Sequence, residues 1–106
     1  MEKISLKKIA EWCGVETKLE GFVEKISTDS RDIDAGTLFV ALKGERFDAN
    51  DFVTDVLAKG AKAVVCSRYE GNDERVILVE DTGKALLDIA AGYRQKRSNQ
   101  KGDFNC

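Results

Sequence analysis

The side chains best suited to bind a ligand come directly after one strongly apolar stretch. Residues 37–42 carry apolar side chains on both alternating faces, which is typical of a central strand covered on both sides. Residues 43–50 follow with a glycine, two cations and a helix start. Free amides at a helix start attract anions, and Gly44 lets a ligand approach the backbone. Because ligands of open α/β sheets bind beyond the carboxyl ends of the strands, this segment indicates an anion site.

Side chains near this segment have the chemistry that phosphate recognition requires. Lys43 and Arg46 add positive charge, and Arg31 can converge on the same anion from the preceding turn. Ser30 offers a hydroxyl that both donates and accepts. Charged residues between a strand and a helix are more often simply solvated, and spacing alone leaves that alternative open. The chain has neither a Gly-x-x-x-x-Gly-Lys-Ser/Thr phosphate loop nor a Gly-x-Gly-x-x-Gly dinucleotide motif.

Other charged clusters have simpler explanations than catalysis. Asp29 and Asp48 could form a carboxylate pair, but turn and capping roles explain both. Glu80 and Asp81 suit the start of the last helix better than a metal site. The basic residues near the end of the chain are Arg94, Lys96, Arg97 and Lys101. They are too few to predict nucleic-acid binding, and no aromatic side chains are interleaved with them.

Composition restricts the classes of protein to consider. The 106 residues suit one compact domain, and the net charge of −2 argues against a nucleic-acid or membrane-surface binder. No stretch approaches about 18 apolar residues and no signal peptide is visible, so we expect a cytoplasmic protein without a membrane span. Three cysteines without a Cys-x-x-Cys pair predict reduced thiols. The absence of histidine excludes a histidine base and imidazole metal ligands.

Hydrophobic periodicity predicts a single small α/β domain with a partly parallel (mixed) sheet and flanking helices. A strand over 37–42, a helix over 51–59 and a strand over 61–66 make a βαβ unit, whose two strands should be parallel. Asp48 or Asn50 can cap its helix. The other predicted elements are a helix from Ser5 to Cys13, a strand over 22–28, a strand over 76–79, and a helix from Asp81 or Thr82 to Tyr93.

The apolar period fails at the end of the chain. Residues 94–106 are polar and charged, with no spacing that would bury one face of a helix or strand. We therefore predict that residues 1–93 form the domain and that residues 94–106 are a disordered or truncated tail.

The segments around the predicted central strand also resemble a known family. The runs 28–31, 35–52, 59–65, 79–82 and 85–86 are similar in order and spacing to the amino-terminal domain of the Mur ligases. The similarity extends over about residues 4–93. Within the family it is greatest to the ligases of the MurF type, which add D-alanyl-D-alanine to UDP-N-acetylmuramoyl-tripeptide.

This resemblance implies a cytoplasmic enzyme of peptidoglycan synthesis that couples ATP hydrolysis to amide-bond formation through an acyl phosphate. Family members have a first domain for the UDP-N-acetylmuramoyl-peptide, a central domain for ATP and magnesium, and a last domain for the incoming amino acid or dipeptide. This chain would be the first domain. It would hold no cofactor of its own, would lack the central ATPase and C-terminal domains, and would be inactive by itself.

The resemblance also assigns site residues, by position. The family's uridine-nucleotide contacts fall on Thr28, Ser30 and the Glu45-Arg46-Phe47 loop, and the residues that flank this pocket are Arg31, Lys43, Asp48 and Asn50. Two departures stand out. The family commonly has histidine where this chain has Asn50, and it continues beyond Tyr93 into a Gly-Lys-Thr nucleotide loop that residues 94–106 do not contain.

Two alternatives remain. A ligase of the MurE type, which adds the third residue of the stem peptide, is similar in the same segments, although the run 41–48 favours MurF. A non-catalytic α/β interaction module could also retain this fold, and it would bind no UDP-sugar.

Overall fold

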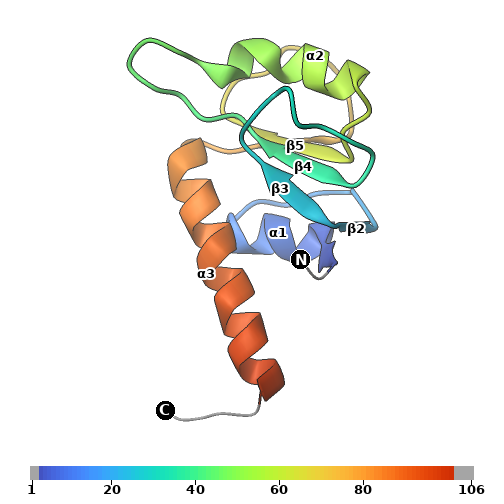
Figure 1. Ribbon diagram of the computed structural model, residues 1–106, viewed down its shortest axis with the longest axis vertical. Coiled ribbons are helices and arrows are strands. Elements are labelled where there is room, and N and C mark those ends of the chain that lie inside the picture. The colour runs from blue at the N-terminus through green and yellow to red at the C-terminus, as the bar shows by residue number, and fades with distance from the viewer. Residues whose placement is uncertain (1–2, 102–106) are drawn as a thin grey trace.

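The protein, described here from a computed structural model, is a small α/β domain in three layers. The structure describes residues 3–101, with side chains as far as Arg94. A four-stranded sheet lies in the middle. Helix α2 (Val53–Ala58) covers one face, and helices α1 (Leu6–Trp12) and α3 (Thr82–Lys101) cover the other (Figure 1). The predicted α/β fold with flanking helices is confirmed.

The central sheet is parallel throughout. Its order is β3 (Lys25–Ser27), β4 (Thr37–Val40), β5 (Ala63–Cys66) and β6 (Val76–Leu78). Every residue of β4 and β5 is buried, as expected for inner strands apolar on both faces. The predicted central strand and the parallel βαβ unit are therefore confirmed. The antiparallel pairing that would make a mixed sheet belongs instead to a separate two-stranded sheet.

Each face of the central sheet packs its own core. Leu38 and Val40 of β4 face α1 and α3, where Ile9 and Ile89 are also buried. Phe39 lies between them along the strand and points to the opposite face, against α2. Alternate side chains of one strand thus anchor helices on both faces, which explains why this strand has no polar side.

The segment 22–28, predicted as one strand, is two strands in different sheets. β2 (Phe22–Val23) pairs antiparallel with β1 (Ile4–Ser5), whereas β3 pairs parallel with β4. Glu24 separates them, and its backbone N–H donates to the carbonyl of Gly36 at 2.8 Å. Val23 and Ile26 pack in the same core although they are three positions apart, so the side chains do not alternate as in a single strand across Glu24.

Helix α1 begins and ends as its sequence predicts. The Ser5 hydroxyl accepts a hydrogen bond from the Lys7 N–H at 3.2 Å, so Ser5 is the N-cap. Gly14 follows the helix with φ = 76°, a conformation that favours glycine.

Helix α2 is shorter than predicted because a 3₁₀ turn, η1 (Ala49–Phe52), precedes it. The Asp48 carboxylate caps this turn by accepting from the Asn50 N–H at 2.9 Å, which decides between the two predicted caps. At the other end, the guanidinium of Arg75 donates to the carbonyls of Leu57 and Ala61 at 3.2 and 3.1 Å.

Helix α3 continues beyond its predicted end at Tyr93, as far as Lys101. Residues 94–101, predicted as the start of a disordered or truncated tail, are helical, so the prediction of disorder is wrong there, whereas a truncated tail and the domain boundary at residue 93 stay predictions. Arg, Gln and Lys are good helix formers, so a helix can continue where the apolar period ends. Residues 102–106, the rest of the predicted tail, lie outside the described part.

Trp12 packs against α3 at a glycine. A Cβ atom on Gly92 would overlap the Trp12 ring, closer than side chains approach one another. Gly92 is buried, and Trp12 borders the core beside α1 and α3. The absence of a side chain at position 92 therefore lets the indole ring lie on the helix, consistent with the core role expected of such an aromatic.

We predict that Gly92→Ala lowers the free energy of unfolding by about 1–2 kcal/mol. Alanine should otherwise stabilise a helix by about 1 kcal/mol, so a net loss reports overpacking against Trp12. Urea denaturation measures the change. In the double variant with Trp12→Leu the penalty should shrink, because the smaller side chain leaves room for the methyl group. A Gly92→Ala protein as stable as the parent would contradict the packing described.

We also predict that the Asp73–Arg75 pair contributes stability that acid removes. The Arg75 guanidinium, bonded to the Asp73 carboxylate at 2.6 Å, holds the pKa of Asp73 below its usual range. A depressed folded-state pKa means that the contribution is complete above the unfolded pKa of about 3.9 and is lost as the pH falls through the folded value. Asp73→Asn should lower Tm at pH 7 and flatten its decline below pH 4. Glu74→Gln, at an exposed neighbour, is the control for the change in net charge.

Candidate functional site

Four loops leave the sheet at the same edge. Because β3 to β6 are parallel, the residues that follow each strand lie along one carboxyl edge. The register pairs Ser27 with Phe39, so Thr28 leaves β3 beside the end of β4. Residues 43–48 follow β4, residues 67–68 follow β5 and residues 80–81 follow β6. The structure thus brings Thr28 and the predicted loop after β4 to one edge, as expected from the sequence.

Residues 43–48 form a short hairpin, called the 43–48 hairpin below. Lys43 and Asp48 make an antiparallel bridge, and the Gly44 N–H donates to the Phe47 carbonyl at 2.6 Å. The Ala49 N–H donates to the Leu42 carbonyl at 2.9 Å and closes the base. Figure 1 shows this hairpin extending away from the body of the domain between β4 and α2. The chain therefore presents five of the predicted site residues on a projecting loop: Lys43, Glu45, Arg46, Phe47 and Asp48.

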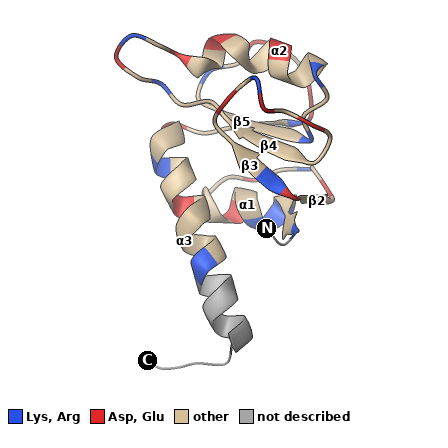
Figure 2. Cartoon of the chain, in the orientation of Figure 1, with Lys and Arg blue, Asp and Glu red and all other residues tan. Residues whose placement is uncertain are grey.

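The charged side chains of the 43–48 hairpin are open to solvent. Lys43, Glu45 and Arg46 are exposed and make no hydrogen bond or ion pair within residues 3–94. Figure 2 shows positions of both charge signs along the projecting hairpin. Phe47 is 55% exposed and stacks on Phe52 of η1, with ring centroids 5.5 Å apart. The hairpin thus offers two cations and one partly exposed aromatic ring, a combination suited to a planar, anionic ligand.

Asn50, in the 3₁₀ turn that follows the hairpin, is held by hydrogen bonds within the fold. Only 6% of it is exposed, and its amide nitrogen donates to the Asp48 carboxylate at 2.7 Å and to the Ser67 hydroxyl at 3.0 Å. Its amide oxygen accepts from the Ser67 N–H at 3.0 Å. Both the nitrogen and the oxygen of the side-chain amide are therefore hydrogen-bonded within the fold. A role for Asn50 in ligand binding stays a prediction.

Arg68 is a site residue that the sequence interpretation missed. Its guanidinium lies 2.7 Å from the Asp51 carboxylate and 3.3 Å from that of Asp48. The pKa of Asp48 is held below its usual range, first by the Asn50 backbone N–H and also by Arg68. A usable signal existed, because Ser67 and Arg68 come directly after a buried strand of the predicted βαβ unit, where the carboxyl-edge rule applies.

The loop after β3 holds the other group of predicted residues. The hydroxyls of Thr28 and Ser30 make no hydrogen bond within the described side chains, so both remain available to a ligand. The Ser30 carbonyl accepts from the Lys59 ammonium at 2.8 Å, which ties this loop to the end of α2.

Arg31 does not converge with the hairpin. Its guanidinium pairs with the Asp29 carboxylate through two contacts of 3.1 Å, and it holds the pKa of that carboxyl below its usual range. With its charge balanced by a near neighbour, Arg31 is a weaker candidate for phosphate recognition than Lys43 or Arg46. Its predicted role flanking the pocket stays untested.

Catalytic chemistry has few candidates along this edge. The Asp81 carboxylate accepts from the Lys84 N–H at 3.1 Å, which confirms the predicted cap of α3. Burial raises the pKa of the Cys66 thiol to about 11, so it is protonated at neutral pH and a poor nucleophile. Within the described residues, no group of three metal-ligating side chains gathers. The arrangement therefore suits binding better than catalysis.

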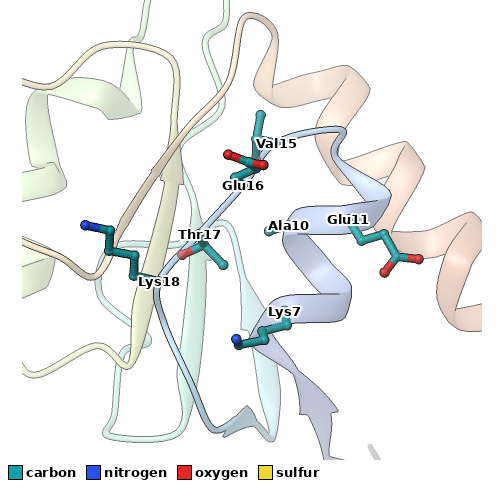
Figure 3. Close-up of a pocket in the computed structure, with 7 residues that line it drawn as sticks. All are labelled: Lys7, Ala10, Glu11, Val15, Glu16, Thr17 and Lys18. Atoms are coloured by element: carbon teal, nitrogen blue, oxygen red, sulfur yellow. The ribbon is translucent and has the colours of Figure 1, made fainter.

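A hollow elsewhere on the surface has mixed charge. It lies between α1 and the extended segment after it and has a volume of about 520 Å³ (Figure 3). Lys7 and Lys18 line it together with Glu11 and Glu16, so neither sign of charge predominates. In the part of the chain that the structure describes, no helix is long and apolar enough to cross a membrane.

Known proteins resemble this chain in both sequence and structure. Residues 23–94 match the model of the Mur ligase family, catalytic domain. The UDP-N-acetylmuramoyl-tripeptide–D-alanyl-D-alanine ligase of Escherichia coli is 45% identical over 74 residues, which are 70% of this chain. The UDP-N-acetylmuramoyl-L-alanyl-D-glutamate–2,6-diaminopimelate ligase of Aquifex aeolicus is 44% identical over 78 residues, or 74% of this chain. A crystal structure of MurF from Acinetobacter baumannii superposes on 92% of this chain with a TM-score of 0.81 and 28% identity.

These relatives are much longer than this chain. The matches span 16% of each of the two ligases and 22% of the Acinetobacter MurF chain. The family model, in contrast, covers more than half of this chain, through the sheet, the hairpin and the first part of α3. The chain belongs to the Mur ligase family.

Proposed function

We propose that this chain is the amino-terminal, UDP-N-acetylmuramoyl-peptide-binding domain of a peptidoglycan ligase of the MurF type, which adds D-alanyl-D-alanine. The observation that carries the proposal is the 43–48 hairpin, whose two cations have no partner among residues 3–94. The names of the Escherichia coli and Aquifex relatives both begin with UDP-N-acetylmuramoyl, a substrate group with an anionic diphosphate. An exposed, unpaired pair of cations at a sheet's carboxyl edge fits such a group.

Each predicted contact has a chemical role. Thr28 and Ser30, with free hydroxyls, would hydrogen-bond the uracil or ribose. Arg46 and Lys43 would face the diphosphate, and Phe47 would lie against a planar part of the nucleotide. Glu45, Asp48 and Asn50 would border the pocket, with Asp48 holding the loop in shape.

The residues present do not suit ATP or magnesium. The chain contains no Gly-x-x-x-x-Gly-Lys-Ser/Thr loop, and its described acidic side chains form no cation cluster. We propose that ATP and magnesium belong to the central domain of the parent ligase, in the cytoplasm, and that this chain alone does not turn over.

A ligase of the MurE type is the second candidate within the family. It is favoured by the Aquifex relative, which is named as a 2,6-diaminopimelate ligase and is nearly as similar to this chain as the Escherichia coli one. Both candidates share the proposed UDP-N-acetylmuramoyl contact. They differ in the amino acid or dipeptide added, so a ligation assay with the parent ligase would separate them. The alternative outside the ligases is a non-catalytic α/β interaction module. Such a module would have no affinity for a UDP-sugar.

An NMR titration tests the proposed binding directly. We expect saturable amide shifts at residues 28–31 and 43–51 on addition of UDP-N-acetylmuramoyl-tripeptide, with smaller shifts for UMP as the control. The affinity of an isolated domain can be as weak as about millimolar, because one wall of an interdomain site is missing. A folded sample with no shift would leave the interaction module, or a pocket completed by other domains, as the explanation. Repeating the titration on the parent ligase decides between these two.

We predict that Arg46→Ala weakens UDP-N-acetylmuramoyl-tripeptide binding roughly tenfold or more. A charge-assisted hydrogen bond to phosphate contributes about 1.5–3 kcal/mol, and Arg46 has no side-chain partner among residues 3–94 whose loss would alter Tm. Arg94→Ala removes an exposed arginine on α3 and serves as the matched control. Equal affinity of the Arg46→Ala protein and the parent would refute the assigned role.

A further inference from the structure

The loop after β5 reaches the base of the 43–48 hairpin. Ser67 and Arg68 leave the sheet one strand away from the hairpin, and their side chains contact Asp48, Asn50 and Asp51. These three partners lie within or next to η1, which directly follows the hairpin. We infer that Ser67 and Arg68 are positioning residues, which hold the hairpin in the orientation that binds ligand. This inference rests on the proposed function.

The contact between Ser67 and Asn50 is reciprocal and sheltered. The Asn50 amide nitrogen donates to the Ser67 hydroxyl, and the Ser67 N–H donates to the Asn50 amide oxygen, both at 3.0 Å. Asn50 is buried and Ser67 is partly buried, so water competes little for these groups. This pair fixes η1 to the end of β5, seventeen positions further along the chain.

Arg68 adds a second connection, through charge. Its guanidinium bridges the carboxylates of Asp48 and Asp51 at 3.3 and 2.7 Å. Asp48 is also the bridge partner of Lys43 and the cap of η1. Any movement of Asp48 therefore moves the closing pair of the hairpin and the helix start together.

Few other contacts within the described residues hold the hairpin. Its own backbone bonds are the Lys43–Asp48 bridge and the Gly44–Phe47 and Ala49–Leu42 hydrogen bonds, and its side-chain anchor is the Phe47–Phe52 stack. A two-stranded hairpin this short is not stable alone in water. Because a mobile loop must be ordered when it binds, an anchor at Asp48 raises affinity without touching the ligand.

Hydrogen exchange on the free protein tests this role without any ligand. In Arg68→Gln we expect the Gly44 and Ala49 amides to exchange about twofold to fivefold faster, the range for a partly exposed ion pair. Exchange in β4 and β5 and the value of Tm should stay unchanged. Arg68→Lys, which keeps the charge, should restore part of the protection. Ser67→Ala should act in the same direction, because it removes the acceptor of the Asn50 amide.

Arg94→Gln is the matched control, since it removes the same charge from an exposed site on α3. Unchanged Gly44 and Ala49 exchange in Arg68→Gln would overturn the inference, as would equal acceleration across the whole sheet, which reports only global destabilisation. A titration with UDP-N-acetylmuramoyl-tripeptide then measures a separate property. If neither this chain nor the parent ligase binds, the proposed function fails and the exchange result still stands. If it binds, Arg68→Gln should weaken affinity severalfold at constant Tm.

Discussion

The parallel pairing of β4 with β5, buried on both faces, is the constraint on which the rest of this domain depends. Phe39 and Val64 anchor α2 on one face, whereas Leu38 and Val65 meet α1 and α3 on the other. Parallel strands need a crossover, and η1 with α2 supplies it. Because all four strands then run the same way, every loop that follows a strand emerges at one edge. The position of the candidate site is a direct consequence of this pairing.

The polar side chains at that edge are of two kinds: those that hydrogen-bond one another and stabilise the loops, and those that remain available to a ligand. Asp48, Asn50, Ser67 and Arg68 satisfy one another around the start of η1. Asp29 and Arg31 pair in the same way at the end of β3. Lys43, Arg46, Thr28 and Ser30 keep side chains without partners within the described residues. Residues of similar type therefore have two roles. Those that are buried or paired stabilise the loops, and those that are exposed and unpaired stay accessible to a ligand.

A chain that covers 16% of its ligase relatives has only part of their surface. Its described residues provide exposed cations on a projecting hairpin, a half-buried Cys13 and a buried Cys66 with raised thiol pKa, and they gather no metal-ligating cluster. The exposed cations are the feature on which the proposed binding function rests.

The sequence by itself determined the central strand, the parallel βαβ unit and the start of α1 at Ser5, because these depend on local periodicity and backbone preference. It left the cap after the central strand open between Asp48 and Asn50. The tertiary structure alone decided that residues 22–27 divide between two sheets, since the pairing partners, β1 and β4, are distant segments of the chain. It also decided that Arg68 supports Asp48 and that Trp12 lies on Gly92. Such contacts join residues far apart in the chain, and no local pattern encodes which side chains will meet.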